Sequence, residues 1–88
     1  MKLRVLPRAK RDLEDIHAHI MAEDPRAAAR TGLAIVQAFE LLVRNPNIGR
    51  PTHRPATREW AVTGQPYLIP YRVNDEFVEI LRVFHTPR

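Results

Sequence analysis

Cationic and acid–base side chains gather in the second half of the chain, where they could act on an RNA phosphodiester. Cleavage of RNA without a metal needs a general base, a general acid and cations that stabilise the charge of the transition state. The side chains available for these roles are Glu59, His85 and the arginines Arg58, Arg72, Arg82 and Arg88. A histidine titrates near neutral pH, and an arginine can hold a phosphate through two hydrogen bonds. The same residues also fit a simpler interpretation, an arginine-rich sheet face with one terminal histidine, and we prefer that interpretation.

Metal binding and nucleophilic catalysis have little support in the sequence. His17 and His19 would point about 200° apart on a helix and could not share one ion. His53 and His85 lie far apart in the sequence, and nothing fixes a third ligand beside them. The chain has no cysteine, no serine and no glycine-rich turn that could hold a nucleophile or a phosphate. We therefore expect no metal site and no cofactor.

The cations lie in two blocks along the chain. Its 88 residues include 14 Lys and Arg against 10 Asp and Glu, a formal net charge of +4. One block precedes the first acid, and the other lies in a second stretch without acids; they comprise Lys2, Arg4, Arg8, Lys10 and Arg11, and then Arg44, Arg50, Arg54 and Arg58. Such blocks suit an acidic partner. Because the second block has no interleaved aromatic residue on which a base could stack, we expect no direct nucleic-acid binding.

Two helices and four strands are predicted to position these groups. Residues 2–6 alternate like a short strand, and apolar residues then recur at helical spacing as far as about residue 22. Asp24-Pro25 indicates a second helix over residues 25–44, since Asp can cap the free N–H groups and Pro suits the first helical position. After an irregular loop to about residue 57, strands are expected over residues 58–63, 67–73 and 77–85.

This order predicts an α+β fold in one domain, residues 1–88: an N-terminal strand, a helical hairpin and a three-stranded antiparallel meander. Asn74-Asp75 is typical of a two-residue hairpin turn. Pro70 lies inside a predicted strand, and because proline cannot donate to the ladder, we expect a bulge or an unpaired N–H there. The helical hairpin should pack on the sheet through Leu13, Ile16, Ile20, Ile35, Phe39 and Leu42.

The apolar arc of the second helix is wider than one neighbouring helix and one sheet face need. We expect a partner to cover the remainder, which comprises Leu33, Val36 and Val43 together with Trp60. The charge blocks suggest that this partner is acidic and folds when it binds. No apolar run approaches the roughly 20 residues of a membrane span, and the first residues lack the apolar core of a signal peptide. We therefore expect a cytoplasmic protein that does not contact a membrane.

The order and spacing of many residues resemble the ParE branch of the RelE/ParE toxin superfamily. These residues are Ala9, Asp12-Leu13, Ile16, Ile20, Asp24-Pro25, Ala28, Pro46, Gly49-Arg50, Arg58-Glu59, Tyr71-Arg72-Val73, Ile80-Leu81-Arg82-Val83, His85 and Arg88. The resemblance covers essentially the whole chain. It implies the toxin of a type II toxin–antitoxin pair, bound and neutralised by a cognate ParD-like antitoxin in a hetero-oligomer.

The resemblance also implies a target, DNA gyrase, which ParE proteins are associated with poisoning. RelE-like relatives are instead ribosome-dependent messenger RNA endonucleases and often carry a C-terminal tyrosine, whereas Thr86-Pro87-Arg88 follow His85 here. We also find no carboxylate placed beside His85 by the sequence. We therefore expect a toxin that binds gyrase without breaking a bond, through Arg58, Arg72, Arg82, His85 and Arg88, all expected to be exposed. The alternatives are a RelE-like endonuclease and a degenerate antitoxin-binding module without target activity.

Overall fold

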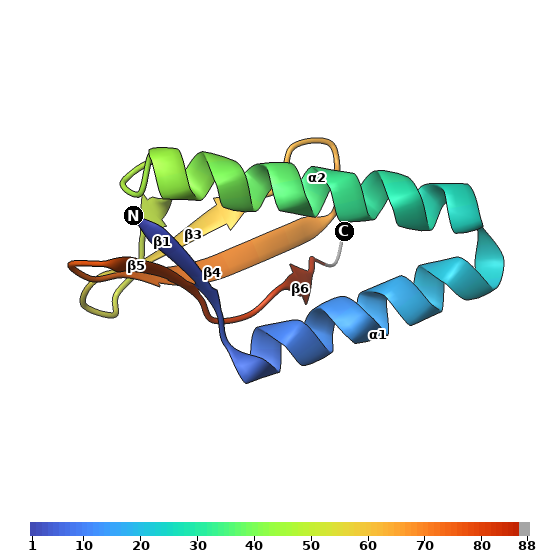
Figure 1. Ribbon diagram of the computed structural model, residues 1–88, viewed down its shortest axis with the longest axis horizontal. Coiled ribbons are helices and arrows are strands. Elements are labelled where there is room, and N and C mark those ends of the chain that lie inside the picture. The colour runs from blue at the N-terminus through green and yellow to red at the C-terminus, as the bar shows by residue number, and fades with distance from the viewer. Residues whose placement is uncertain (87–88) are drawn as a thin grey trace.

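The computed structural model describes residues 1–86, which form a helical hairpin packed against a mainly antiparallel sheet (Figure 1). The elements in chain order are β1 (Lys2–Val5), α1 (Pro7–Glu23), α2 (Pro25–Arg44), β2 (Arg50–Pro51), β3 (Thr57–Ala61), β4 (Tyr67–Val73), β5 (Phe77–Ile80) and β6 (Phe84–His85). The predicted α+β class, with an N-terminal strand, two helices and antiparallel strands, is confirmed.

Asp24 separates the two helices and interacts with both. Its backbone N–H donates to the carbonyl of Ile20 and ends α1, while its Oδ1 accepts from the backbone N–H groups of Arg26 and Ala27. Pro25 occupies the first turn of α2. The predicted cap is therefore present. From this junction the two helices diverge, so that their far ends lie well apart (Figure 1).

The sheet order is β1-β5-β4-β3-β2 within the described part of the chain, and β6 pairs with β4. The β1–β5 pair is parallel and the others are antiparallel. Two strand limits differ from the predictions: the first strand ends at Val5, and the strand predicted over 58–63 covers Thr57–Ala61. A short strand, Arg50–Pro51, lies inside the predicted irregular loop and pairs with β3. With only two residues it was too short to give an alternating pattern.

The strand predicted over residues 77–85 is interrupted, which corrects the meander at its last strand. Tyr71 pairs with Ile80, but Leu68 pairs with Phe84, so three residues of the last segment (81–83) lie opposite two of β4. One residue is therefore extra, as in a β-bulge. Pro70 lies at this point; its carbonyl accepts from the N–H of Leu81, but it has no N–H to return. The irregularity expected at Pro70 is thus confirmed. The extra residue lies opposite Pro70, in segment 81–83, and not in β4 itself.

The core lies between α2 and the inner face of the sheet. Ile35, Phe39 and Leu42 are buried there as predicted, against Ile69 and Tyr71 of β4. Leu13 and Ile16 of α1 are partly buried and pack against this core, whereas Ile20 lies at the edge of an apolar groove between the helices. Across residues 1–86, neither helix is long and apolar enough to cross a membrane.

Candidate functional site

Arg72 lies on the sheet face opposite α2, where it is paired with a buried carboxylate. Its Nε donates to Glu79 Oε1 at 2.9 Å, and Arg4 Nη1 of β1 donates to Glu79 Oε2 at 3.3 Å. The hydrogen bond from Arg72 is the main reason that the pKa of Glu79 lies below its ordinary value. The Arg4 guanidinium also lies 3.8 Å from the centre of the Phe77 ring. These contacts therefore fix the orientation of both arginines.

Arg82 is turned toward α1 by the bulge. Its Nε and Nη2 donate to the two carboxylate oxygens of Asp12 at 2.7 and 3.1 Å, and the Val83 N–H donates to the same carboxylate at 3.0 Å. Burial alone would raise the pKa of Asp12, but the hydrogen bonds from Arg82 and Val83 outweigh it and lower the pKa. The Arg82 side chain keeps only 30% of its exposure. The prediction that Arg82 is exposed is therefore wrong, because the carboxylate holds it against α1.

Arg58 holds the loop that follows α2. Its Nη1 donates to the Gly49 carbonyl at 2.8 Å, while the Gly49 N–H donates to the hydroxyl of Tyr71 and that hydroxyl donates to the Pro46 carbonyl. Tyr71 is fully buried, which raises the pKa of its hydroxyl. A Cβ at Gly49 would lie 2.9 Å from the Glu59 carbonyl and still closer to Tyr71, so this position requires glycine. Arg58 is half-buried in this contact. The prediction that its side chain is exposed is therefore wrong.

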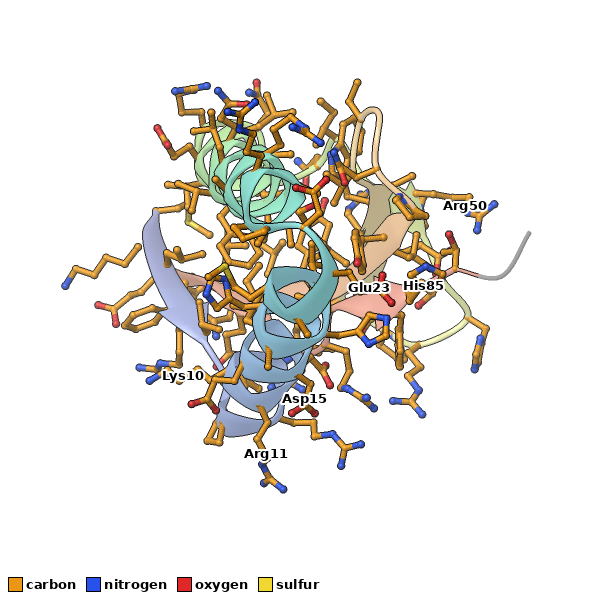
Figure 2. The ribbon with its side chains drawn as sticks, turned by 90° about the vertical axis from the view of Figure 1, so that its right-hand side faces the viewer. Lys10, Arg11, Asp15, Glu23, Arg50 and His85 are labelled. Carbon is orange, nitrogen blue, oxygen red and sulfur yellow. The ribbon has the colours of Figure 1, made fainter. Side chains whose placement is uncertain are left out.

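His85 lies beside a hollow of about 480 Å³ between α1 and the end of the sheet. Its ring meets Tyr67 edge-on, with centroids 5.4 Å apart. Asp15 and His19 of α1 line the same hollow; Figure 2 labels Asp15 on α1 and His85 on β6. Asp15 and His85 thus line one hollow, but no hydrogen bond or ion pair joins them within residues 1–86. No group of three acidic or histidine side chains within residues 1–86 has the geometry of a metal site.

The predicted target-binding residues do not form one patch. Arg58 and Arg72 lie on neighbouring strands, but their register positions, opposite Tyr71 and Thr57 respectively, place them on opposite faces of the sheet. Arg82 contacts α1, and His85 lies at the hollow described above. Arg88 lies outside the described residues.

The residues predicted to bind a partner lie along the outer side of α2 and near it. Leu33 and Val36 are 59% and 51% exposed, which leaves them available to a partner. Val43 and Trp60 are partly buried against the core, and Trp60 lines a small hollow of about 150 Å³ between α2 and β3. Val36 also lines the apolar groove of about 230 Å³ between α1 and α2, whose other walls include Ile16, Ile20 and Phe39.

Four functional candidates were missed by the sequence analysis: Asp12, Asp15, His19 and Glu79. Asp15 and His19 are four residues apart, a spacing that places two side chains on one helix face, so the sequence could have paired them. Glu79 interrupts an apolar strand, Phe-Val-Glu-Ile, and an acid in such a run indicates a charged partner. For Asp12 there was no such pattern, because its partners lie 70 residues away at a bulge.

Comparison with known proteins gives a consistent result. Residues 3–88 match the model of a family described as the ParE toxin of the type II toxin–antitoxin system parDE. A candidate toxin of Sinorhizobium fredii, Y4kP, is 43% identical over 84 residues, covering 96% of this chain and 86% of that protein. Toxin RelE1 of Caulobacter vibrioides is 39% identical over 80 residues, covering 89% and 85%. The solved structure of the chromosomal ParDE toxin–antitoxin system from P. aeruginosa has a TM-score of 0.85, with 29% identity, covering 99% of this chain and 97% of that one.

Proposed function

The chain belongs to the ParE toxin family of type II toxin–antitoxin systems, and we propose that it inhibits DNA gyrase by binding, without breaking a bond, and is neutralised by a cognate antitoxin. The similarity to the ParDE structure, with a TM-score of 0.85 over nearly the whole chain, supports the ParE branch. A binding toxin needs only a complementary surface, which a small, rigid sheet can provide.

One observation carries this proposal: the arginines that an RNase would use to bind a phosphate already bind carboxylate or carbonyl oxygens of the protein itself. Arg72 holds Glu79, Arg82 holds Asp12 through two hydrogen bonds, and Arg58 holds the Gly49 carbonyl. A phosphate would have to displace these partners, and the displaced carboxylates would lose charge-assisted hydrogen bonds. Fixed, paired side chains are better suited to a stable contact surface than to a clamp that opens and closes around a substrate.

An antitoxin partner is supported by the apolar surface on the helices. Leu33 and Val36 are more than half exposed on α2, and the groove between the helices is almost entirely apolar. Exposed apolar surface of this kind is typical of a protein interface. Arg11 projects from α1 away from the rest of the molecule (Figure 2), and such exposed cations would attract an acidic segment.

The proposal is tested with purified protein, purified gyrase and a translating ribosome system. We expect the toxin to block supercoiling or to trap gyrase cleavage complexes, and to leave messenger RNA uncut. Addition of the antitoxin should restore supercoiling. Expression in bacteria with and without the antitoxin gene provides the cellular control: toxin alone should reduce viability and induce the DNA damage response.

A ribosome-dependent endonuclease is the second candidate, and one observation favours it. The hollow beside His85 contains a second histidine, a carboxylate and the buried Tyr67, which are groups that can transfer protons. The name of one relative, toxin RelE1, is consistent with an endonuclease. Messenger RNA cleavage that disappears in both His85→Ala and His19→Ala, together with unaffected supercoiling, would favour the endonuclease. Absence of both activities, with antitoxin binding intact, would indicate a degenerate module.

A further inference from the structure

A second hollow, of about 450 Å³, opens on the other side of the sheet, between β3, β4, residues 81–84 and the loop 52–57. Its floor includes Pro70 and Leu81. Ile69 and Tyr71 point into the core with α2, so the alternation of side chains along β4 places Pro70 on the opposite face. The hollow is therefore separated by the sheet from the apolar groove between the helices.

The bulge supplies one wall of this hollow and fixes its shape. Beyond residues 81–83, Phe84 remains 39% exposed on β6, and the Arg82 guanidinium lies 4.4 Å from the centre of its ring. Arg82 is itself held by both oxygens of Asp12. An aromatic ring stacked on an immobilised arginine loses little freedom when a ligand binds, so this wall is ready to receive an apolar side chain.

The opposite wall is a loop stiffened by its own threonines. The N–H and hydroxyl of Thr52 donate to the Thr57 carbonyl at 3.0 and 3.1 Å, and the Arg54 N–H donates to the Thr52 hydroxyl at 3.2 Å. Ala56 has φ of +57°, a conformation that alanine rarely adopts, and its carbonyl accepts from the Val73 N–H. Strained backbone of this kind persists only where its surroundings hold it. The loop therefore presents His53 and Arg54 at a fixed place on the rim.

The rim carries positive charge that has no partner in residues 1–86. Arg54 is exposed and forms no ion pair there, whereas the one carboxylate in the lining, Glu59, is already paired with Arg50. Arg82 is neutralised by Asp12 in the same way. Thus Arg54 is the uncompensated cation of the hollow, next to His53 and above an apolar floor.

From this arrangement we propose that the hollow docks an acidic segment of the toxin's protein target, with one apolar side chain of that segment seated against Phe84 and a carboxylate paired with Arg54. This inference rests on the proposed function, since it names the surface that contacts the target. A volume of this size admits one large side chain with its flanking backbone. Charge complementarity at the rim selects the acidic partner, because Arg54 lacks a carboxylate of its own.

Charge reversal at the rim tests the inference directly. Binding of purified gyrase to immobilised toxin is measured for the parent, for Arg54→Glu and for Phe84→Ala, with supercoiling inhibition measured in parallel. Arg30→Glu on α2 is the matched control, because Arg30 is also an exposed arginine but lies on the helical hairpin. We expect Arg54→Glu and Phe84→Ala each to weaken gyrase binding by about tenfold or more, as removal of a central interface contact does, and Arg30→Glu to remain within about twofold. Thermal unfolding verifies that each variant is folded.

The possible outcomes separate the inference from the proposed function. If the parent inhibits gyrase and Arg54→Glu inhibits equally well, the docking site is wrong and the proposed function stands. If the parent neither binds nor inhibits gyrase, both are wrong. A single-stranded oligonucleotide is tested in the same assay: if Arg54→Glu abolishes oligonucleotide binding but leaves gyrase binding unchanged, the hollow accepts nucleic acid and the acidic protein segment is excluded.

Discussion

Asp12 shows how one carboxylate can join a helix to an irregular strand. Residues 81–83 depart from the ladder, so the Val83 N–H would lack a partner if Asp12 did not accept from it. The same carboxylate accepts twice from Arg82, and the Nε of Arg8, on the preceding turn of α1, lies 3.8 Å from its Oδ1. Asp12 therefore gives the Val83 N–H a hydrogen-bond partner and also holds the Arg82 guanidinium in place.

Asp12→Asn should destabilise the protein by about 1.5 to 3 kcal/mol at pH 7, the usual range for hydrogen bonds to a charged group. The pKa of Asp12 is lower in the folded protein than its ordinary value of 3.8, so its contribution is fully present above that value and is lost as the pH falls through the folded pKa. The difference between parent and variant in urea unfolding should therefore shrink below about pH 4. An equal difference at pH 7 and pH 2 would show that the charge of Asp12 is not responsible.

The Tyr71 hydroxyl gives a second prediction at this scale. It accepts from the Gly49 N–H at 2.8 Å and donates to the Pro46 carbonyl at 2.7 Å, in a side chain with no exposed area. Tyr71→Phe keeps the ring but leaves both backbone groups without this partner, and we expect a loss of about 1 to 3 kcal/mol in urea unfolding. Tyr67→Phe is the matched control, since no hydrogen bond from that hydroxyl is present within residues 1–86. Equal losses in the two variants would contradict the anchoring role of Tyr71.

At the scale of elements, α2 is the helix on which the fold depends. Its inner face packs against the sheet through buried side chains, while α1 packs mainly on α2, reaches the core through Leu13 and Ile16, and is joined to residues 82 and 83 by Asp12. The apolar period of α2 can be read from the sequence because its 20 residues repeat it over about five turns. Substitutions on the buried and the exposed face of α2 should therefore differ clearly in their effect on stability.

Phe39→Ala should cost about 3 to 5 kcal/mol, because Phe39 is 6% exposed and its removal leaves a cavity between α2 and the sheet. In so small a domain this is a large share of the total stability. Leu33→Ala on the exposed face of the same helix should change the stability by less than about 0.5 kcal/mol. Thermal unfolding of the two variants provides the comparison. A midpoint for Phe39→Ala equal to that of the parent would refute the assigned register.

The sequence predicted those elements whose pattern repeats or whose ends carry a specific residue type. Asp24-Pro25 located the helix junction, and Pro70 located the disturbance in the sheet, because each residue has a local physical effect. The interruption at 81–83 could not be read from its own residues, since Leu-Arg-Val continues the strand pattern. The pairings of Arg72 with Glu79 and Arg82 with Asp12 depend on distant contacts, so the arginines assigned from sequence as free contact groups are held in place.

At the scale of the whole molecule, the helical layer and the sheet layer present two distinct surfaces on opposite sides of the fold. The helical layer carries exposed apolar side chains and a groove, whereas the far face of the sheet carries paired arginines and the hollow bounded by Arg54 and Phe84. A partner on one layer does not have to cover the other. Neutralisation by an antitoxin on the helices would then act by obstructing the approach of a large target or by displacing α1, which diverges from α2 and contacts little of the sheet (Figure 1).

The last prediction concerns the proposed binding of an antitoxin to the helical layer. An acidic segment that buries Leu33 and Val36 should stabilise the toxin by mass action, by about 2.7 kcal/mol at a free concentration one hundredfold above its dissociation constant. Val36→Asp combined with Leu33→Asp should abolish this rise in the thermal midpoint, because a carboxylate would be buried in the interface and would repel an acidic chain. Ile48→Asp, an equally drastic change at an exposed apolar residue outside the helices, should leave the rise unchanged. If the double variant still inhibits gyrase but is no longer neutralised, the two layers carry separate functions; if antitoxin protection persists in the double variant, the antitoxin binds elsewhere.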